Sequence, residues 1–123
     1  MADTPIDFGI LAGAGATARA FRAGDVIFSQ GDAATELFVI QSGQVEIRLG
    51  NRLLETVPER GIFGEMALVD KAPRSATAVA ATDVRLVPVG EKQFLFLLGH
   101  TPYFALNVMR VLARRLRLAN GVL

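Results

Sequence analysis

The sequence predicts an α+β protein that is mainly β: an antiparallel β-roll or jelly roll of about eight strands, one inserted segment and two C-terminal helices. Two observations predict this fold. Turn-forming Gly, Asp, Asn and Pro residues recur at intervals of roughly 8 to 12 residues over about residues 16–89, with β-prone segments between them. After Pro88 the pattern changes to helix start and stop signals.

The first region contains seven or eight short segments with the character of strands. Val45, Ile47 and Leu49 alternate with polar neighbours, which is the period-two pattern of a strand with one side facing water. The segments are TARAF, VIF, ELFVIQ, QVEIRL, RLLETV, ATAVAA and VRLVPV, separated by turns such as AGD, QGD, SG, GN and PERG. Short strands with turns at this spacing are typical of an antiparallel sandwich or barrel.

Two helices are expected over about residues 90–120. The segment GEKQFLFLLGH has the character of a short helix that stops at Gly99. A longer helix begins with Thr101 as its N-cap and Pro102 in its first turn, and Gly121 follows its end. The arginines of its last turns are favoured there by the helix dipole.

Composition excludes several classes of function. The 123 residues carry 13 basic and 12 acidic side chains, a net charge of +1, so no general attraction to nucleic acid or to anionic membranes is expected. The absence of cysteine excludes disulfides and thiol catalysis and favours a cytoplasmic location. The N-terminal segment is a poor signal peptide, and no apolar run is long enough to span a membrane. A single domain over residues 1–123 is expected.

The inserted segment FGEMALVDKAPRSATA places one carboxylate and one guanidinium around a short helical turn. Arg74 offers a planar fork of donors that fits two oxygens of a phosphate. Glu65, which only accepts hydrogen bonds when ionised, suits sugar hydroxyls. Gly64 allows close backbone approach beside the unpaired N–H groups of a helix start. A phosphate and a hydroxyl bound close together indicate a nucleotide, and a compact pocket fits a cyclic one best.

This segment resembles the phosphate-binding cassette of the cyclic nucleotide-binding domain family, the β-roll found in the catabolite activator protein and in regulatory subunits of cyclic-AMP-dependent kinase. The resemblance is carried by Phe63-Gly64-Glu65-Met66-Ala67-Leu68 and by Pro73-Arg74-Ser75-Ala76-Thr77. It extends to VIFSQGD, ELFVIQSGQVEI and the late segment MRVLARRLR, so that some 100 residues are covered.

The resemblance implies a role for each residue of the cassette. Glu65 would accept from the ribose 2′-hydroxyl, and Arg74 would pair with the phosphate. Backbone N–H groups of the cassette would surround the phosphate and sugar, and the serine that follows Arg74 favours cAMP over cGMP. The ligand-binding residues expected are Phe63, Gly64, Glu65, Met66, Ala67, Arg74, Ser75, Ala76 and, from the last helix toward the base, Asn120.

The chain departs from the family pattern in three places. Ala119 stands where a hydroxyl residue would face the base, which weakens base selection by side chains. The helix that usually precedes the first strand is reduced or absent. No helix-turn-helix follows the last helix, because the sequence ends at Leu123, so direct DNA binding is not expected.

Several alternatives stay open at the level of sequence. Glu65 and Arg74 could form an internal salt bridge that closes the loop, and Ser75 could contact phosphate or cap a strand. The last helix carries a broad apolar side, either buried by the roll or shared with a second copy in a homodimer. That side comprises Phe104, Val108, Val111, Leu112 and Leu116, opposite a polar stripe of Asn107, Arg110, Arg114 and Arg117.

The function expected is a non-enzymatic sensor that binds a cyclic nucleotide, cAMP before cGMP, and closes its last helix over the ligand about His100-Thr101-Pro102. With a single histidine, the sequence provides neither a metal cluster nor a base for a serine nucleophile, so no catalysis, metal or cofactor is expected. The alternative is a β-roll that has lost ligand binding and serves as an interaction or dimerisation module.

Overall fold

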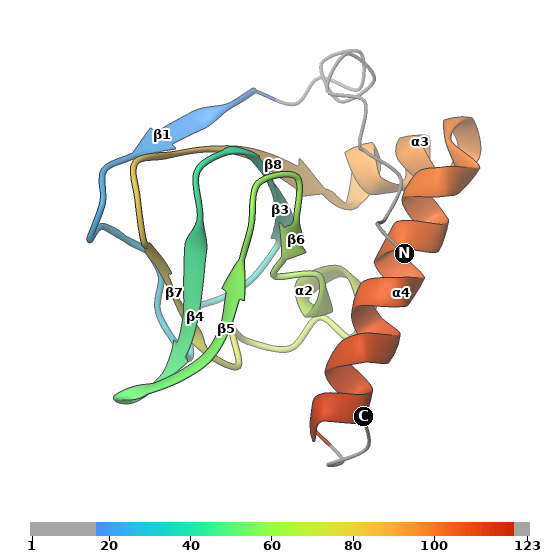
Figure 1. The fold of residues 1–123 in the computed structure, drawn as a ribbon. Helices are drawn as coiled ribbons and strands as arrows, with labels where there is room; N and C mark the ends of the chain where they lie inside the picture. The colour runs from blue at the N-terminus through green and yellow to red at the C-terminus, as the bar shows by residue number, and fades with distance from the viewer. Residues whose placement is uncertain (1–16, 120–123) are drawn as a thin grey trace.

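Eight strands in two antiparallel sheets form the roll of the computed structural model, which describes residues 17–119 (Figure 1). One sheet has the order β1-β8-β3-β6, and the other has the order β2-β7-β4-β5. The strands are β1 (Arg19–Phe21), β2 (Val26–Phe28), β3 (Glu36–Ser42), β4 (Val45–Leu49), β5 (Arg52–Val57), β6 (Ile62–Phe63), β7 (Thr77–Ala80) and β8 (Val84–Gly90). The predicted mainly β, α+β fold is confirmed.

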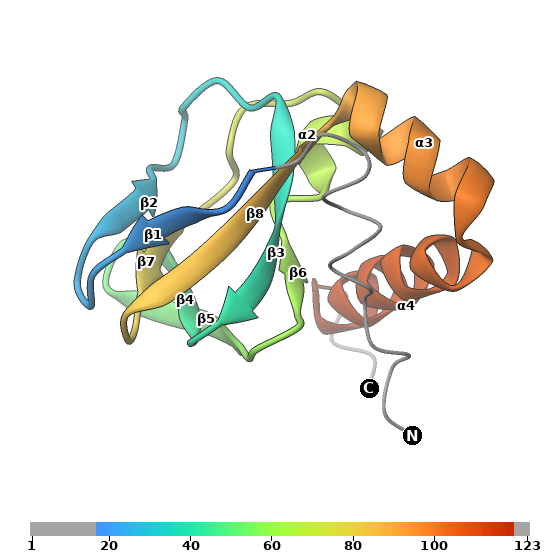
Figure 2. The same ribbon diagram turned by 90° about the horizontal axis from the view of Figure 1, so that it is seen from above.

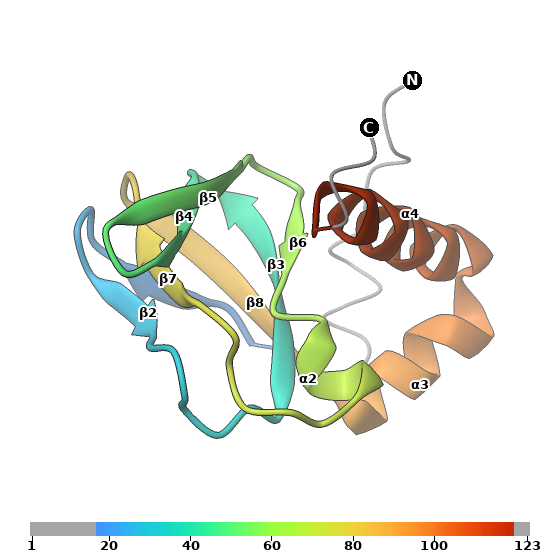
Figure 3. The ribbon, with the colours of Figure 1, turned by 90° about the horizontal axis from the view of Figure 1, so that it is seen from below.

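Within residues 17–119, three helices accompany the roll: α2 (Met66–Val69), α3 (Glu91–His100) and α4 (Pro102–Ala119). The views in Figures 1 and 2 both place α3 and α4 on one side of the roll, beside β3 and β6, whereas β1 and β2 lie on the opposite side. Seen from below, α2 lies where the chain leaves β6, between the roll and α3 (Figure 3). No helix of the described residues is long and apolar enough to cross a bilayer.

Strand β3 explains why the fold has two apolar cores. Its segment ELFVIQ is almost continuously apolar because alternate side chains are buried on both faces of the strand. Leu37 and Val39 pack toward the helices, together with Leu97 and Phe104. Phe38 and its alternate neighbours pack inside the roll, in a cluster with Ile40, Val45, Val57, Phe63, Ala78, Ala80, Val84 and Leu86. Strand β3 is therefore covered by the helices on one face and by the interior of the roll on the other.

The two C-terminal helices lie as predicted, with small differences at their ends. Helix α3 begins after Gly90, whose N–H donates to Oε1 of Gln93 at 3.1 Å. It continues through Gly99 to His100, one residue beyond the expected stop. Thr101 alone separates α3 from α4, so the interruption between the two helices lies at the expected position. The single domain predicted over residues 1–123 stays a prediction, and Asn120 and Gly121 lie outside the described residues.

The predicted faces of α4 are wrong in one place, because Asn107, expected in the polar stripe, is buried. Leu116, expected on the apolar side that is either buried by the roll or shared with a second copy, is 63% exposed, so the roll does not bury it. The buried residues Phe104, Val108 and Val111 follow spacings of four and three, which defines the face toward the roll. Arg115 continues this series. Leu116 lies one position further along the helix, so its side chain points away from the roll.

Packing of α4 on the roll should depend on its buried aromatic residue and not on the exposed one beside it. We expect Phe104→Ala to lower the free energy of unfolding by about 3–5 kcal/mol, because a buried ring leaves a cavity. Tyr103→Ala, a control on the exposed face, should change it by less than about 0.5 kcal/mol. Urea unfolding followed by circular dichroism measures both variants, and equal losses would contradict this placement of α4.

Candidate functional site

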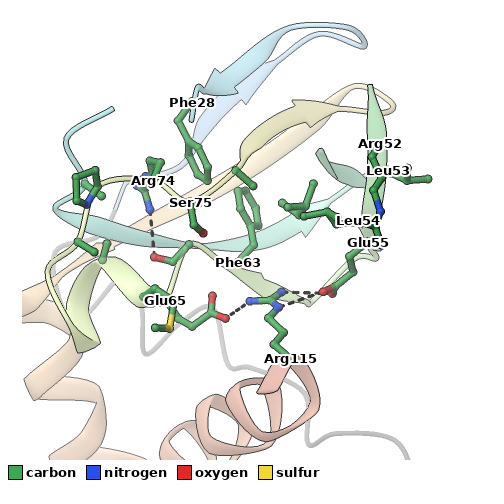
Figure 4. Close-up of a pocket in the computed structure, with 18 residues that line it drawn as sticks. Phe28, Arg52, Leu53, Leu54, Glu55, Phe63, Glu65, Arg74, Ser75 and Arg115 are labelled. Carbon is green, nitrogen blue, oxygen red and sulfur yellow. Dashed lines mark hydrogen bonds and ion pairs between the residues drawn. The ribbon is translucent and has the colours of Figure 1, made fainter. Parts of the chain in front are cut away.

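A cavity of about 660 Å³ lies between the inserted segment, strand β5 and helix α4 (Figure 4). This volume is in the range of small-molecule sites in proteins. The residues predicted from the sequence that line it are Phe63, Gly64, Glu65, Met66, Ala67, Arg74, Ser75 and Ala76. The ninth, Asn120, lies outside the described residues. Sequence reasoning therefore grouped residues that the fold brings together around one cavity.

The inserted segment connects β6 to β7 and bends at Gly64. This glycine has a φ of +77°, a region that side chains with a Cβ rarely adopt. A Cβ added there would lie 2.7 Å from a terminal nitrogen of Arg74, so the end of that side chain would have to shift from its position. The chain then turns into α2, where the N–H of Ala67 donates to the carbonyl of Gly64 at 3.3 Å. The N–H of Ala67 is one of the cassette donors predicted to bind phosphate, and it already has a hydrogen-bond partner within the protein.

Arg74 is buried, with 8% of its surface exposed, yet its hydrogen bonds go to carbonyls and not to a carboxylate. Its terminal nitrogens donate to the carbonyls of Gly64 at 3.1 Å and Glu36 at 2.8 Å. Its Nε is buried and has no hydrogen-bond partner among the described residues. The predicted alternative of a salt bridge between Arg74 and Glu65 is therefore wrong for residues 17–119.

Burial also changes the electrostatics of Arg74. Desolvation lowers the pKa of this guanidinium, while the charges of Glu36, Asp32 and Glu65 oppose that shift. An arginine remains charged in proteins at physiological pH, so the site contains a buried cation that forms no salt bridge with a carboxylate of residues 17–119, although three carboxylates act on it electrostatically. A buried charge of this kind is costly unless it is paired, and an anionic ligand would supply the pair.

Aromatic rings of the roll also contact the guanidinium of Arg74. The Arg74 guanidinium carbon lies 4.0 Å from the ring centroid of Phe28, in cation–π geometry. Phe28, Phe38 and Phe63 contact one another, with centroids 5.4 to 6.1 Å apart. The backbone of Arg74 is bonded as well, since its N–H donates to Asp32 and its carbonyl accepts from Gly31. Arg74 is thus fixed by the roll alone.

Ser75 follows Arg74 along the wall of the cavity. Its side chain is exposed, and it forms no hydrogen bond with another described residue. At the start of β7 it is Thr77 that forms a side-chain hydrogen bond, because its hydroxyl accepts from the N–H of Gln30 at 3.0 Å. Of the two roles considered for Ser75, capping of this strand is therefore not the one observed, and its hydroxyl is available to a ligand.

Glu65 is almost fully buried, with 2% of its surface exposed, and its partner is Arg115 of α4. The same guanidinium donates to both carboxylate oxygens of Glu55, at 3.1 and 3.3 Å, and to the carbonyl of Ile62 at 2.9 Å. Figure 4 shows Arg115 reaching from α4 between the two glutamates. Burial lowers the pKa of Arg115, but the hydrogen bond with Glu55 and the charges of both glutamates outweigh it, so the pKa is raised.

Three charged residues of the cavity were not predicted from the sequence: Arg52 and Glu55 of β5, and Arg115 of α4, which was assigned only to the helix dipole. A signal for Arg115 was present in the sequence. The buried residues Phe104, Val108 and Val111 are followed by 115 at the next spacing of four, so this arginine belongs to the face toward the roll. A charged residue at such a position needs a buried partner, and Glu65 is the buried carboxylate nearby.

No group of His, Cys, Asp and Glu side chains within residues 17–119 could hold a metal ion. The charged groups of the cavity are instead guanidiniums and carboxylates: Arg52, Glu55, Glu65, Arg74 and Arg115. This set can bind an anion and accept hydrogen bonds from hydroxyls, and its contacts are those of a binding site for a polar anionic molecule.

Comparison with known proteins decides the family. The profile of the family described as "Cyclic nucleotide-binding domain" matches residues 18–101, well over half of the chain. The chain belongs to the cyclic nucleotide-binding domain family. It is related to cyclic AMP receptor proteins and to regulatory subunits of cAMP-dependent protein kinase. The family resemblance predicted from the cassette is confirmed.

Three similar proteins illustrate the relationship. The cyclic AMP receptor protein of Thermus thermophilus is 38% identical over 107 residues, which cover 83% of this chain and 50% of that protein. The crystal structure of the Thermus thermophilus catabolite activator protein has a TM-score of 0.78 at 36% identity and covers 92% of this chain and 55% of that one. The cAMP-bound EAL enzyme Bd1971 has a TM-score of 0.64 at 37% identity, over 85% of this chain and 29% of that one. The chain thus spans about half the length of the curated relative, and the family domain also occurs within an enzyme.

The close approach at Gly64 can be tested without a ligand. We expect Gly64→Ala to destabilise the protein more than Gly50→Ala, by at least about 1 kcal/mol. Both glycines have positive φ, but a Cβ at Gly50 meets no atom within 4 Å, whereas one at Gly64 meets Arg74. Gly50→Ala therefore measures the backbone penalty alone. Chemical unfolding of both variants provides the comparison, and equal destabilisation would show that Arg74 does not require this glycine.

Proposed function

We propose that this chain is a non-enzymatic sensor module that binds a cyclic nucleotide, with cAMP preferred. The observation that carries the proposal is the buried guanidinium of Arg74, which faces a cavity of about 660 Å³ without an adjacent carboxylate among the described residues. A cyclic phosphodiester carries one negative charge, which matches one unneutralised cation. The half-buried guanidinium of Arg115, which lines the same cavity, is already paired with two glutamates.

The cassette residues take distinct roles in this proposal. Arg74 pairs with the phosphate, the hydroxyl of Ser75 donates to it, and Glu65 accepts from the ribose 2′-hydroxyl. Phe63, Gly64, Met66, Ala67 and Ala76 shape the wall around the sugar phosphate, chiefly through their backbone. The preference for cAMP is supported by the resemblance of Ser75 to the serine of cAMP-binding cassettes and by relatives whose names state a cAMP ligand. Asn120 stays a predicted contact of the base.

Closure of the last helix over the ligand is the proposed response. Arg115 already places the late turns of α4 at the edge of the cavity. The break at Thr101, between α3 and α4, gives the chain a point about which α4 can move. A ligand that contacts both the roll and α4 would favour the closed arrangement through its greater affinity for it. A cytoplasmic location stays a prediction.

The phosphate contact can be tested by calorimetry with cAMP. We expect Arg74→Ala to weaken binding by at least about 2 kcal/mol, roughly 30-fold, because the anion would lose its buried partner. Arg74→Lys should also weaken it, since an ammonium cannot make the two-pronged contact. Arg85→Ala is the control and should leave the affinity unchanged, because this exposed guanidinium of β8 does not line the cavity. Unchanged affinity of Arg74→Ala would remove Arg74 from the phosphate site.

The second candidate is an interaction module without a ligand, and one observation favours it: the ribose acceptor Glu65 already has an internal partner. Thermal unfolding with cAMP and cGMP separates the two functions, because a ligand of the folded state raises the midpoint by mass action. Absence of a shift with both nucleotides would support the interaction module.

We further propose a homodimer through α4. Met109 and Leu116 are 60% and 63% exposed, and with the half-buried Ala105 and Leu112 they form a stripe at spacings of four, three and four. That spacing is the seam of a two-stranded coiled coil. An exposed apolar stripe on a surface helix favours association with another helix.

The dimer predicts a specific defect. We expect Met109→Glu to shift the protein toward the monomer in sedimentation velocity at micromolar concentration, because a charge in a coiled-coil seam is desolvated on association. Leu49→Glu, at an exposed leucine of the β4 end away from α4, is the control and should sediment as the parent does. A parent protein that is monomeric at all concentrations would contradict the homodimer.

A further inference from the structure

Three elements that are distant in the sequence meet at the guanidinium of Arg115. The side chain comes from α4, Glu55 comes from β5, and Glu65 follows β6 (Figure 4). The contacts with Glu55 involve both carboxylate oxygens, through Nε at 3.1 Å and a terminal nitrogen at 3.3 Å. A two-pronged pair of this kind fixes the plane of the guanidinium as well as its position.

The position of Glu65 depends on this guanidinium. Its carboxylate is buried, and Arg115 is its sole side-chain hydrogen-bond donor within residues 17–119. A buried carboxylate with one donor takes the orientation which that donor imposes. Arg115 is in turn oriented by Glu55 and by the carbonyl of Ile62. The orientation of the proposed ribose acceptor is therefore determined through Arg115 by a residue of β5.

Glu55 has no part in the phosphate contact. Arg74 is fixed by the carbonyls of Gly64 and Glu36 and by the ring of Phe28, and none of these groups belongs to α4 or β5. The two halves of the site thus have separate supports within the described structure. The phosphate half is built on the roll, whereas the ribose half requires α4 to lie against β5.

We propose that Glu55 is a positioning residue for the ribose site: by fixing Arg115 it orients Glu65, so that recognition of the 2′-hydroxyl requires α4 to be docked on β5. This inference rests on the proposed binding of a cyclic nucleotide. According to this inference, the docking of α4 affects how well the site distinguishes a ribose from a 2′-deoxyribose, and this effect is separate from the phosphate contact. When α4 moves away, Arg115 leaves both glutamates, and the site keeps its phosphate contact but loses its defined acceptor for the sugar.

The test compares cAMP with 2′-deoxy-cAMP by calorimetry, because their affinity ratio isolates the 2′-hydroxyl. We expect the parent protein to bind cAMP roughly tenfold or more tightly than the deoxy analogue, as one hydrogen bond to a charged group provides. In Glu55→Gln the ratio should fall to about threefold or less, while affinity for the deoxy analogue changes by less than about twofold. In Arg115→Gln the affinities for cAMP and 2′-deoxy-cAMP should become equal.

A matched control is available on the neighbouring strand of the same sheet. Glu46 of β4 is paired with Arg48 at 2.9 Å, and it is about as exposed as Glu55. Glu46→Gln therefore removes a comparable paired carboxylate that does not contact Arg115, and it should leave the ratio unchanged. Circular dichroism checks that each variant is folded. If Arg115→Gln does not fold, Glu55→Gln decides the question alone.

The outcomes separate this inference from the function on which it rests. If the parent binds neither nucleotide, the proposed function and this inference both fail. If the parent binds and discriminates the two ligands but Glu55→Gln keeps the parent ratio, the proposed function stands and the role of Glu55 is overturned. A variant that loses affinity for both ligands by the same factor would show a general structural effect of Glu55, which also overturns the positioning role.

Discussion

The cavity of this protein depends on a buried guanidinium that is fixed in place but not neutralised. Arg74 donates to two backbone carbonyls and lies on the ring of Phe28, and these contacts determine its position without cancelling its charge. A carboxylate in the same place would have satisfied the guanidinium and closed the site to anions. Two backbone carbonyls accept from its terminal nitrogens instead, and its Nε has no partner among the described residues, so that a positive charge without a salt-bridge partner remains at the wall of the cavity.

The other guanidinium of the cavity has the opposite arrangement. Arg115 lies between two carboxylates, and its charge is fully compensated by its neighbours in the described structure. It joins α4 to β5 and to the start of the cassette, whereas Arg74 contacts the roll only. The same type of side chain thus serves two purposes. An uncompensated arginine is suited to bind a ligand, and a compensated one is suited to orient the structure around it.

The two faces of helix α4 also differ in what they contact. Phe104, Val108 and Val111 pack on the sheet, and Arg115 continues that face to the edge of the cavity. Met109 and Leu116 point away from the roll and form the apolar stripe proposed for a second copy. One helix therefore contacts the cavity on one side and carries an exposed apolar stripe on the other. In the proposed function, a change in its position would couple the ligand to the second copy.

The sequence by itself determined the fold class, the order of elements and the part of the cavity lining that the inserted segment provides. These follow from local patterns: turn residues at regular spacing, alternation along strands, helix caps, and a short motif whose residues are close in the chain. Only the tertiary structure decided that Glu65 pairs with Arg115 and not with Arg74, and that Asn107 is buried while Leu116 is exposed. The physical reason is that contacts between residues 50 or 60 positions apart depend on how α4 rotates and docks on β5. A rotation of one helix position exchanges a buried side chain for an exposed one, and no local pattern specifies the partner across that interface.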